Sequence, residues 1–358
     1  MAIAIVGAGL IGRLLAWQLL EAGHRVTLFD RDHGGGELSA GFVAAAMLAP
    51  LSEVLDAEPV VYRQGLAGIA VWRQWLGRLS AASGVAVDFR ANGSIVVAHR
   101  NDRGDYQQLL QRLQAQQDIN HGSISQLDKA GLAALEPELA ERFDHGCFLR
   151  SEGCLDNLAL YQALATRIDQ LGGQRISRQV EQPAALEGFA GVVDCRGFAA
   201  GAAVSGLRGV RGEVIRVNAP EVSLSRPVRL VHPRYKLYIA PRPGHQYVIG
   251  ATQIESSSEQ AITVRSSLEL LSALYSVHTG FAEAHIVSQQ ARCRPAFADN
   301  LPQIRRQGRV LQVNGLYRHG YLLAPAVVSQ ALYELGAGGE NCWPAIVCHE
   351  DVIARDVS

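Results

Sequence analysis

The sequence has little of what marks nucleic-acid-binding, membrane-spanning or metal-binding proteins. Its 358 residues carry a formal net charge of −1, which gives no electrostatic basis for binding nucleic acid or an anionic membrane surface. No apolar run approaches the roughly 18 residues that a membrane-spanning helix needs. The six cysteines form no CxxC pair and no zinc-binding spacing. We therefore expect no nucleic acid, no membrane and no metal among its partners.

Motifs for several enzyme classes are also missing. The chain has no Ser-His-Asp order, no HExxH and no Walker loop, so nothing supports hydrolysis or phosphoryl transfer. Scattered cysteines in a chain of this size are typical of a reducing compartment. The first apolar strand begins at residue 2, with no basic segment and no cleavable apolar segment before it. We therefore expect a cytoplasmic protein without a signal peptide.

What the chain does have is a nucleotide-binding signature in its first thirty residues. Residues 2–6 are apolar and β-branched, as in a buried parallel strand. Three glycines in G-x-G-x-x-G spacing follow, and residues 10–22 have the composition of a helix, with Gly23 at the position of a helix C-cap. A second strand, RVTLFD, ends at Asp30. This order predicts a βαβ unit.

Each of the three glycines has a mechanical role in such a unit. Gly7 allows the tight turn, Gly9 lets the backbone approach a pyrophosphate, and Gly12 lets the helix pack close to the sheet. The pyrophosphate then lies at the positive N-terminal end of the helix. Asp30 lies 18 residues beyond Gly12, where its carboxylate can accept hydrogen bonds from a ribose. The pattern indicates an adenine dinucleotide, without saying which.

The chain contains no second G-x-G-x-x-G. Enzymes that carry electrons from a nicotinamide to a flavin usually need two dinucleotide sites, so a single site favours a flavin that takes electrons directly from a substrate. Residues 191–195 and 309–315 read as strands that return to the nucleotide sheet. From Gly212 onward, strand-like segments alternate with Pro and Gly turns, which predicts an antiparallel sheet. We expect a nucleotide domain assembled from separated segments, with this sheet inserted between them.

Six motifs follow one another along the chain in a specific order. They are GAGLIG with Asp30, AAAMLAP ending at Pro50, RGVRGEVIRV at 208–217, LYIAPR at 237–242 followed by VIGAT, RCRPAFADNLPQI at 292–304 and GLYRHGYLLAP at 315–325. In this order they resemble the D-amino acid oxidase-like FAD-dependent oxidoreductases, and most closely the glycine oxidases of thiamine biosynthesis. The resemblance implies non-covalent FAD and oxidation of a small amino acid to its imine.

The same resemblance implies the domain organisation. The fold is expected to mix α/β and α+β architecture, with a Rossmann-like FAD-binding domain of the glutathione-reductase type and an inserted antiparallel-sheet substrate domain. The FAD-binding domain is expected to take residues 1–80, 147–209 and 292–358. The substrate-binding domain is expected to take residues 81–146 and 210–291.

Three residues are implied to be catalytic. An amino acid oxidase must hold the substrate carboxylate, and arginine suits this because its planar fork forms two parallel, charge-assisted hydrogen bonds. By resemblance that residue is Arg294, which precedes Pro295. Tyr238 matches a tyrosine whose hydroxyl also meets the carboxylate. Arg318 matches a position beside the flavin, where its backbone carbonyl can accept the substrate amine and its side chain can screen the pocket mouth.

The substrate pocket departs from the family pattern. Met47 matches a methionine over the flavin, but three alanines, Ala44 to Ala46, precede it where glycine oxidases carry Ala-Gly. Gln253 stands where a second pocket methionine is expected, and Lys236 where a histidine is expected. These departures leave the reaction type unchanged and the preferred amino acid open.

The residues that the resemblance assigns to FAD binding come from separate stretches of the chain. They are Gly7, Gly9, Leu10, Ile11, Gly12, Asp30, Arg31, Ala45, Ala46, Met47, Val180, Gly197, Leu316, Tyr317, Arg318, His319, Gly320, Tyr321 and Leu322. Sarcosine oxidases of the same superfamily attach flavin through a cysteine near Cys293. By alignment that cysteine falls on Arg292, so we interpret Cys293 as a packing residue.

The function that follows is oxidative deamination of glycine, sarcosine or a small D-amino acid, by hydride transfer from Cα to flavin N5. Oxygen would accept the electrons, giving hydrogen peroxide, a 2-oxo acid and ammonia. Two alternatives remain open: a D-amino acid dehydrogenase that passes electrons to a quinone or carrier, and a non-catalytic dinucleotide-binding regulator. The sequence leaves open whether the chain forms a homo-oligomer, which acceptor it uses, and whether it serves thiamine synthesis or amino acid catabolism.

Overall fold

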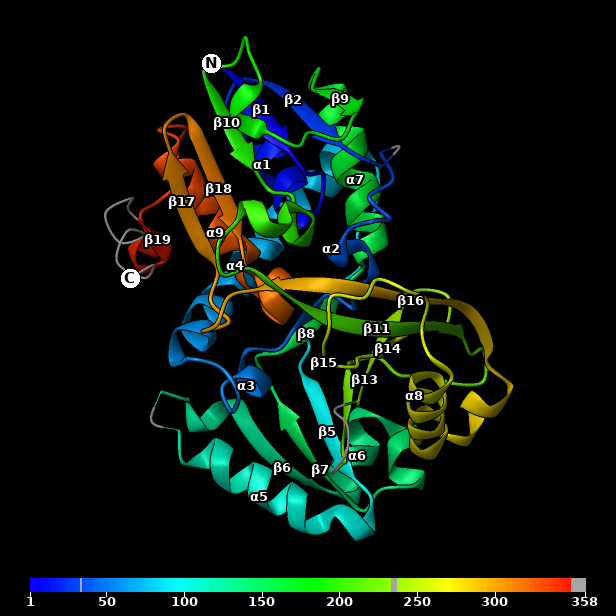
Figure 1. The fold of residues 1–358 in the computed structure, drawn as a ribbon. Coiled ribbons are helices and arrows are strands. Elements are labelled where there is room, and N and C mark those ends of the chain that lie inside the picture. The colour runs from blue at the N-terminus through cyan, green and yellow to red at the C-terminus, as the bar shows by residue number, and fades with distance from the viewer. Residues whose placement is uncertain (33, 117, 233–236, 349–358) are drawn as a thin grey trace.

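The computed structural model describes residues 1–32, 34–116, 118–232 and 237–348. Within these residues the strands form two large sheets and one small one. The two large sheets lie one above the other in Figure 1, and the long strands β11 and β16 form the part of the lower sheet that is nearest the upper one.

The first large sheet contains the N-terminal βαβ unit. Its strand order is β19-β17-β18-β10-β1-β2-β9, and all its pairs are parallel except β17 with β18. The bounds are β1 Ala2–Val6, β2 Arg25–Asp30, β9 Gln174–Ser177, β10 Gly191–Asp194, β17 Gln303–Gln307, β18 Val310–Asn314 and β19 Val347–Cys348. The predicted return of residues 191–195 and 309–315 to this sheet is confirmed.

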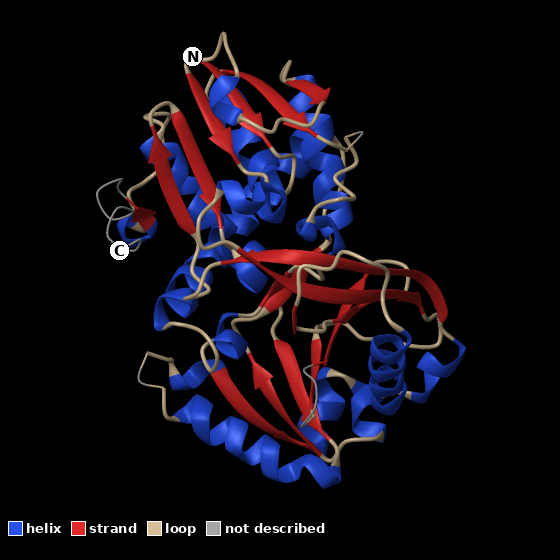
Figure 2. Ribbon diagram, viewed as in Figure 1, coloured by secondary structure: helices blue, strands red, loops and turns tan. Residues whose placement is uncertain are grey.

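Four helices cover one face of this sheet, and Figure 2 shows them behind its strands. They are α1 (Leu10–Glu21), α4 (Pro59–Ser83), α7 (Asn157–Gln170) and α9 (Gly320–Glu334). Side chains of a strand alternate between its two faces, so Ile3 and Ile5 pack against these helices. Ala4 and Val6 pack on the opposite face with Val180. Apolar burial on both faces explains why β1 is a continuous apolar run.

The first turn of α9 is joined to α4 by a buried hydrogen bond. Residue 325 of α9 is proline, so it has no N–H for the carbonyl of Tyr321, four residues earlier. The indole Nε1 of Trp72, which is fully buried on α4, donates to that carbonyl at 2.7 Å. Gly65 and Gly68 of α4 let the helices approach, because a Cβ at either would press on Leu322.

The second large sheet is mixed. Its order is β15-β11-β14-β13-β12-β5-β7-β6, with β16 paired to β11. The bounds are β5 Ser94–Ala98, β6 Ile124–Asp128, β7 His145–Leu149, β11 Arg208–Asn218, β12 Val228–Val231, β13 Leu237–Arg242, β14 Gln246–Gly250, β15 Ile254–Glu255 and β16 His285–Ala296. Its pairs are antiparallel, as predicted, except that β12 runs parallel to β5. That pair joins two segments about 130 residues apart, so no hairpin fixed its direction.

Shorter elements complete the fold. The small sheet has the order β3-β8-β4, with β3 Met47–Leu48, β4 Phe89–Arg90 and β8 Gly153–Leu155. The other α-helices are α2 Ala40–Val43, α3 Pro50–Glu53, α5 Arg103–Gln114, α6 Lys129–Leu135 and α8 Val264–Val277. The 3₁₀ turns are η1 Arg100–Asp102, η2 His121–Ser123, η3 Pro137–Glu141, η4 Pro183–Ala185, η5 Gly197–Ala203, η6 Thr279–Glu283, η7 Tyr317–His319 and η8 Pro344–Ile346.

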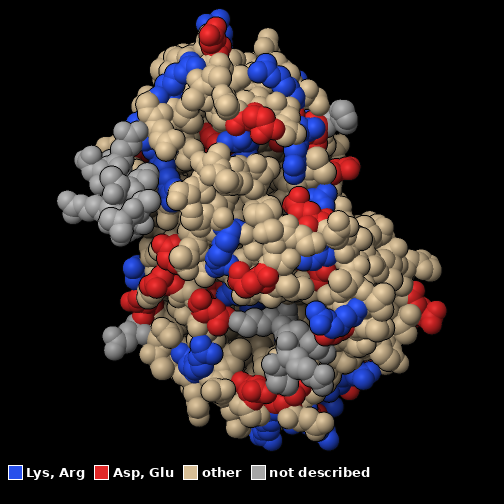
Figure 3. Space-filling view, viewed as in Figure 1, with Lys and Arg blue, Asp and Glu red and all other residues tan. Residues whose placement is uncertain are grey.

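The two large sheets draw on separated segments of the chain, as the sequence indicates. Strands β7 and β16 of the second sheet run across the domain boundaries expected at 146/147 and 291/292, and the division into domains stays a prediction. Figure 3 shows acidic and basic side chains interspersed on the visible face. No helix in the described ranges combines the length and apolarity needed to cross a membrane.

The Trp72 hydrogen bond gives a stability prediction. In Trp72→Phe the carbonyl of Tyr321 loses its donor inside the core, and an unpaired buried carbonyl costs about 1–3 kcal/mol. We expect the urea unfolding midpoint to fall by this free energy divided by the slope m of the unfolding curve. Tyr333→Phe, at an exposed position of α9, serves as the control and should leave the midpoint unchanged. Equal midpoints for Trp72→Phe and the parent would show that the carbonyl finds another donor.

Candidate active site and cofactor cleft

A long cleft lies at the carboxyl ends of the parallel strands, on the side of the first sheet that faces the second. It encloses about 1420 Å³ of space, part of it open to solvent. Its walls include the residues that follow β1, β2, β10 and β18, together with Arg294 and the turn before α9. Ligands of open α/β sheets bind at this edge of the sheet.

The glycine turn after β1 forms the floor of the cleft. Gly7 has φ of +101°, and a Cβ there would collide with the backbone of Cys195, so only glycine fits. A Cβ at Gly12 would collide with the carbonyl oxygen of Gly7, which is the close helix–sheet contact that the motif predicts. A Cβ at Gly9 would meet only the Cβ of Ser39, at 3.6 Å, and would project into the cleft.

The side chains of Asp30 and Arg13 bind the backbone of this turn. The carboxylate of Asp30 accepts hydrogen bonds from the backbone N–H groups of Ala8 and of Asp32. The guanidinium of Arg13, which is almost fully buried, donates to the carbonyls of Ala8 at 2.7 Å and of Gly34 at 2.6 Å. Both backbone groups of Ala8 are therefore bound by side chains, which fixes the turn relative to the loop after β2.

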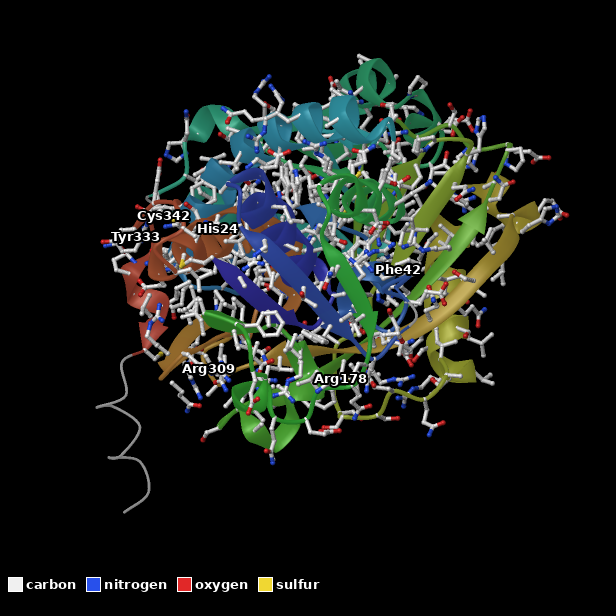
Figure 4. All side chains as sticks on the ribbon, turned by 90° about the horizontal axis from the view of Figure 1, so that it is seen from above. His24, Phe42, Arg178, Arg309, Tyr333 and Cys342 are labelled. Carbon is white, nitrogen blue, oxygen red and sulfur yellow. The ribbon has the colours of Figure 1, made fainter. Side chains whose placement is uncertain are left out.

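The far end of the cleft lies beside β2 and β9. Arg31, Arg178 and Val180 line it, and Arg31 lies 3.8 Å from Glu259. Figure 4, seen from above, labels Arg178, just after β9, and Phe42 of α2. Ala40 and Gly41 of α2 also line the cleft, so its wall continues from the first sheet to α2.

The chain leaves the helical conformation after α2 ends at Val43: Ala44 has φ of −57° and ψ of 157°, and Ala46 has φ of +47°. Two buried arginines of the second sheet bind its backbone: Arg242 donates to the carbonyl of Ala45 at 2.6 Å, and Arg216 donates to that of Phe42 at 3.3 Å. Burial lowers the pKa of Arg216 to about 10, with a further lowering from Arg242, so it remains charged at neutral pH. Met47 follows in β3, half-buried.

Arg294 lies on β16 and lines the other end of the cleft. Its Nη1 donates to the carbonyl of Thr252 at 3.1 Å. A Cβ at Gly212, on the neighbouring strand β11, would collide with its Nη2, so that glycine provides the room for the guanidinium. Within the described part of the chain, Arg294 has no carboxylate within ion-pair distance, and it is half-buried.

Tyr238 lies on β13, opposite Arg229 of β12 and Gly250 of β14. A Cβ at Gly250 would lie 3.0 Å from its hydroxyl oxygen. Burial raises the pKa of Tyr238 above its ordinary value, against the opposing effects of Arg294 and Arg229. The hydroxyl is therefore protonated at neutral pH and can donate a hydrogen bond to an anion.

Arg318 lies in η7, immediately before α9, which begins at Gly320. Its guanidinium contacts Glu53 at 2.6 Å, the amide oxygen of Gln253 at 3.1 Å and Asp56 at 3.3 Å. The neighbouring imidazole of His319 is buried. Burial lowers the pKa of His319 to about 4, so it is neutral at physiological pH.

Residues 250–253 connect the three candidate catalytic side chains. Gly250 lies beside the Tyr238 hydroxyl, the Thr252 carbonyl accepts from Arg294, and Gln253 accepts from Arg318. Met47, Tyr238 and Ala251 pack on one apolar cluster. Arg294 and Arg318 line this end of the cleft, and the contacts above place Tyr238, Met47 and Gln253 near them without lining it. Lys236 lies outside the described residues.

The residues that the sequence assigns to FAD binding separate into two groups. Those that line the cleft are Gly7, Gly9, Leu10, Ile11, Asp30, Arg31, Val180, Gly197, Leu316, Tyr317, Arg318, Gly320 and Tyr321. Those behind its walls are Gly12, Ala45, Ala46, Met47, His319 and Leu322. Sequence reasoning missed Arg13, which binds the glycine turn, Arg196 and Glu259, which line the cleft, and Glu53, which pairs with Arg318. Among these residues only Arg13 carried a signal, as a charge next to the glycine motif.

Three comparisons bear on the family. A family model described as FAD dependent oxidoreductase matches residues 2–333. A Rhizobium etli protein assigned as the thiamine biosynthesis oxidoreductase ThiO is 41% identical over 338 residues, covering 94% of this chain and 96% of that protein. Glycine oxidase of Geobacillus kaustophilus is 26% identical over 347 residues, covering 90% of this chain and 89% of the relative.

Solved structures share the fold. Iminodiacetate oxidase from Chelativorans sp. BNC1 has a TM-score of 0.80 at 20% identity, covering 97% of this chain and 99% of that chain. At this level of identity the likeness concerns the arrangement of sheets and helices alone. It agrees with the expected Rossmann-like domain carrying a second sheet.

The residues of the cleft fit FAD. The open side of Gly9 leaves space where a side chain would intrude, and the N-terminus of α1 has no side-chain cap, so its backbone N–H groups remain for a phosphate. Asp30 and Arg31 would lie at the adenosine end, and the turn before α9 at the other. Within the described residues, no group of three or more His, Cys, Asp or Glu could hold a metal ion.

Asp30 gives a prediction about cofactor affinity. Asp30→Ala removes the acceptor that fixes the Ala8 N–H and the acceptor available to a ribose. We expect FAD binding to weaken by about 1–3 kcal/mol, the usual cost of losing a charge-assisted hydrogen bond, here at a half-buried residue. Titration of the apoprotein with FAD, followed by flavin fluorescence, measures this. Asp105→Ala, an exposed change on α5, is the control. An unchanged dissociation constant for FAD in Asp30→Ala would show that Asp30 ends the strand without contributing to FAD binding.

Proposed function

The chain belongs to the FAD-dependent oxidoreductase family, and on that premise we propose that it oxidises glycine or another small amino acid with one carboxylate. One observation carries the proposal. The guanidinium of Arg294 lies at the end of the cleft without a carboxylate partner among the described residues, next to a protonated tyrosine hydroxyl. Such a pair suits a substrate carboxylate, since Arg offers a two-pronged donor and Tyr a third hydrogen bond.

The chain's own groups would orient the substrate. Arg294 and Tyr238 would bind the carboxylate, and the backbone carbonyl of Arg318 would accept a hydrogen bond from the amine. The amine must lose its ammonium proton before hydride can leave Cα, and solvent can take this proton. Neutral His319 adds no positive charge to the site. Bound FAD would supply the acceptor for the hydride.

We propose that FAD is held without a covalent bond. Cys293 is the cysteine nearest Arg294 in sequence, and it is buried, with its thiol directed to the carbonyls of Ser256 and Ser258. Burial raises the pKa of Cys293, which disfavours the thiolate. These features support a packing role.

The overall reaction we propose takes an amino acid, oxygen and water to a 2-oxo acid, ammonia and hydrogen peroxide. Thiamine biosynthesis is the setting that the name of the Rhizobium etli relative suggests. We propose a cytoplasmic location, in line with the scattered cysteines. The family assignment sets aside the non-catalytic regulator.

The cofactor and acceptor are tested together. The purified protein should be yellow, and acid precipitation should release the flavin. Mixing with glycine in the absence of air should bleach the flavin, and admitting air should restore the colour and produce peroxide. Flavin that stays in the acid pellet would contradict non-covalent binding. Bleaching that air fails to reverse would favour the dehydrogenase alternative.

Arg294→Ala tests the carboxylate clamp. Losing one partner of a desolvated charge pair costs about 2–5 kcal/mol, which lowers kcat/KM for glycine by roughly two to four decades. Arg294→Lys should recover only part, because an ammonium lacks the fork. Gly212→Ala is a matched variant that displaces the guanidinium and keeps its charge, so it should lower kcat/KM with normal flavin content. Activity of Arg294→Ala within about threefold of the parent would overturn the clamp.

A further inference from the structure

Glu53 is a carboxylate beside the candidate site that no motif singled out. It is the last residue of α3, and its side chain is 13% exposed. It does not line the cleft. Glu53 is therefore not placed to touch a substrate in the cleft, and its role must come from the groups that it contacts.

The carboxylate contacts three basic groups from two other elements. One oxygen, Oε2, lies 2.6 Å from Nη2 of Arg318 and 3.5 Å from Nδ1 of His319. The other oxygen, Oε1, lies 3.7 Å from Nη2 of Arg229 on β12. Glu53 therefore links α3 to the turn η7 and to the second sheet.

The turn that it holds is conformationally unusual. Tyr317, the first residue of η7, has φ of +50°, a left-handed value that costs a non-glycine residue free energy. The two residues that follow Tyr317 are the two that face Glu53. Nε of Arg318, Nδ1 of His319 and Oε2 of Glu53 form no hydrogen bond among the described residues, so Glu53 acts on this turn through charge. It does so together with the contacts of Arg318 to Gln253 and Asp56.

Glu53 also sets the charge balance of the site. Burial alone would raise the pKa of Glu53, but its basic neighbours lower it overall; Arg318 and Arg229 carry their charge at neutral pH, so the carboxylate is ionised there. It lies at ion-pair distance from two of the three arginines near Tyr238, and Arg294 remains without such a partner in the described part of the chain.

We propose that Glu53 is a positioning residue for substrate oxidation: it holds the turn at Arg318 and neutralises Arg318 and Arg229, so that the substrate carboxylate binds to Arg294. This proposal rests on the proposed function. It implies that the site binds a substrate with one carboxylate, at Arg294, because the charges of Arg229 and Arg318 are already compensated.

The proposal predicts changes of opposite sign in binding and turnover. In Glu53→Gln, Arg229 loses its carboxylate partner and Arg318 keeps only Asp56, so one excess positive charge remains near the site. A carboxylate should then bind more tightly, by roughly 3- to 10-fold for charges separated by several ångströms at a partly exposed site. The turn at Arg318 is released at the same time, so kcat for glycine should fall about 10- to 100-fold. A merely structural role would weaken binding and turnover together.

The experiment measures kcat and KM for glycine and the dissociation constant of acetate, read from the visible spectrum of the flavin in the holoenzyme. Glu58→Gln, an exposed change of the same kind five residues away, is the matched control. Glu53→Asp keeps the charge on a shorter side chain, so it should lower kcat and leave acetate affinity unchanged. In Glu53→Gln/Arg229→Met one excess cation is removed, and acetate affinity should return to within about twofold of the parent.

Three results would overturn the proposal: parent-like kcat in Glu53→Gln, weaker acetate binding in that variant, or a double variant that binds acetate as tightly as Glu53→Gln does. If Glu53→Gln fails to fold, the Glu53→Asp variant tests the proposal: lower kcat with unchanged acetate affinity supports it, and parent-like kcat or weaker acetate binding overturns it. A parent enzyme that does not oxidise glycine contradicts the proposed function instead, and the acetate titrations then judge the role of Glu53 without turnover.

Discussion

The hydrogen bond from Trp72 to the carbonyl of Tyr321 is the interaction on which one end of the cleft depends. Pro325 leaves that carbonyl without its helical donor, and the indole replaces it. The bond sets the position of the first turn of α9 against α4. The hydroxyl of Tyr321 reaches the carbonyl of Gly41 at 2.8 Å, so the same residue also joins α9 to α2. The turn η7, with Arg318 and His319, is placed by the helix that follows it.

The βαβ unit could be predicted from sequence because its determinants are local. Gly7, Gly12, Gly23 and the apolar strand lie within thirty residues, and their spacing alone identifies the unit, although Gly7 also meets the distant backbone of Cys195. The return of the later strands could be predicted because they are short, apolar and followed by glycine. The parallel pairing of β12 with β5 could not, because the alternation of side chains is the same for either direction of pairing. The end of the helix before Ala44 was equally hidden, since alanine favours helix and the groups that bind the next backbone carbonyls, on Arg216, Arg242 and Leu155, lie far away in the sequence.

The candidate site shows the same division. Arg294, Tyr238 and Arg318 were found through motifs around them, and the structure brings them to one end of the cleft; their roles stay predictions. Glu53 was not found because its partners lie at positions 229, 318 and 319, and no sequence pattern near residue 53 indicates contact with them. A carboxylate whose role is to compensate distant cations leaves no local pattern.

The cleft is assembled from strands that lie at both ends of the chain, and this bears on the order of events during synthesis. The glycine turn is made first, yet β18 and the turn before α9 are completed only near residue 319. Non-local parallel pairing is slow compared with helix formation and needs both segments to have left the ribosome. Strand β1 can pair early with β2, but β10 and then β18 join this sheet only as later segments are made. A dinucleotide can therefore find its complete site only after the turn before α9 has emerged, so for this topology the cofactor is loaded late.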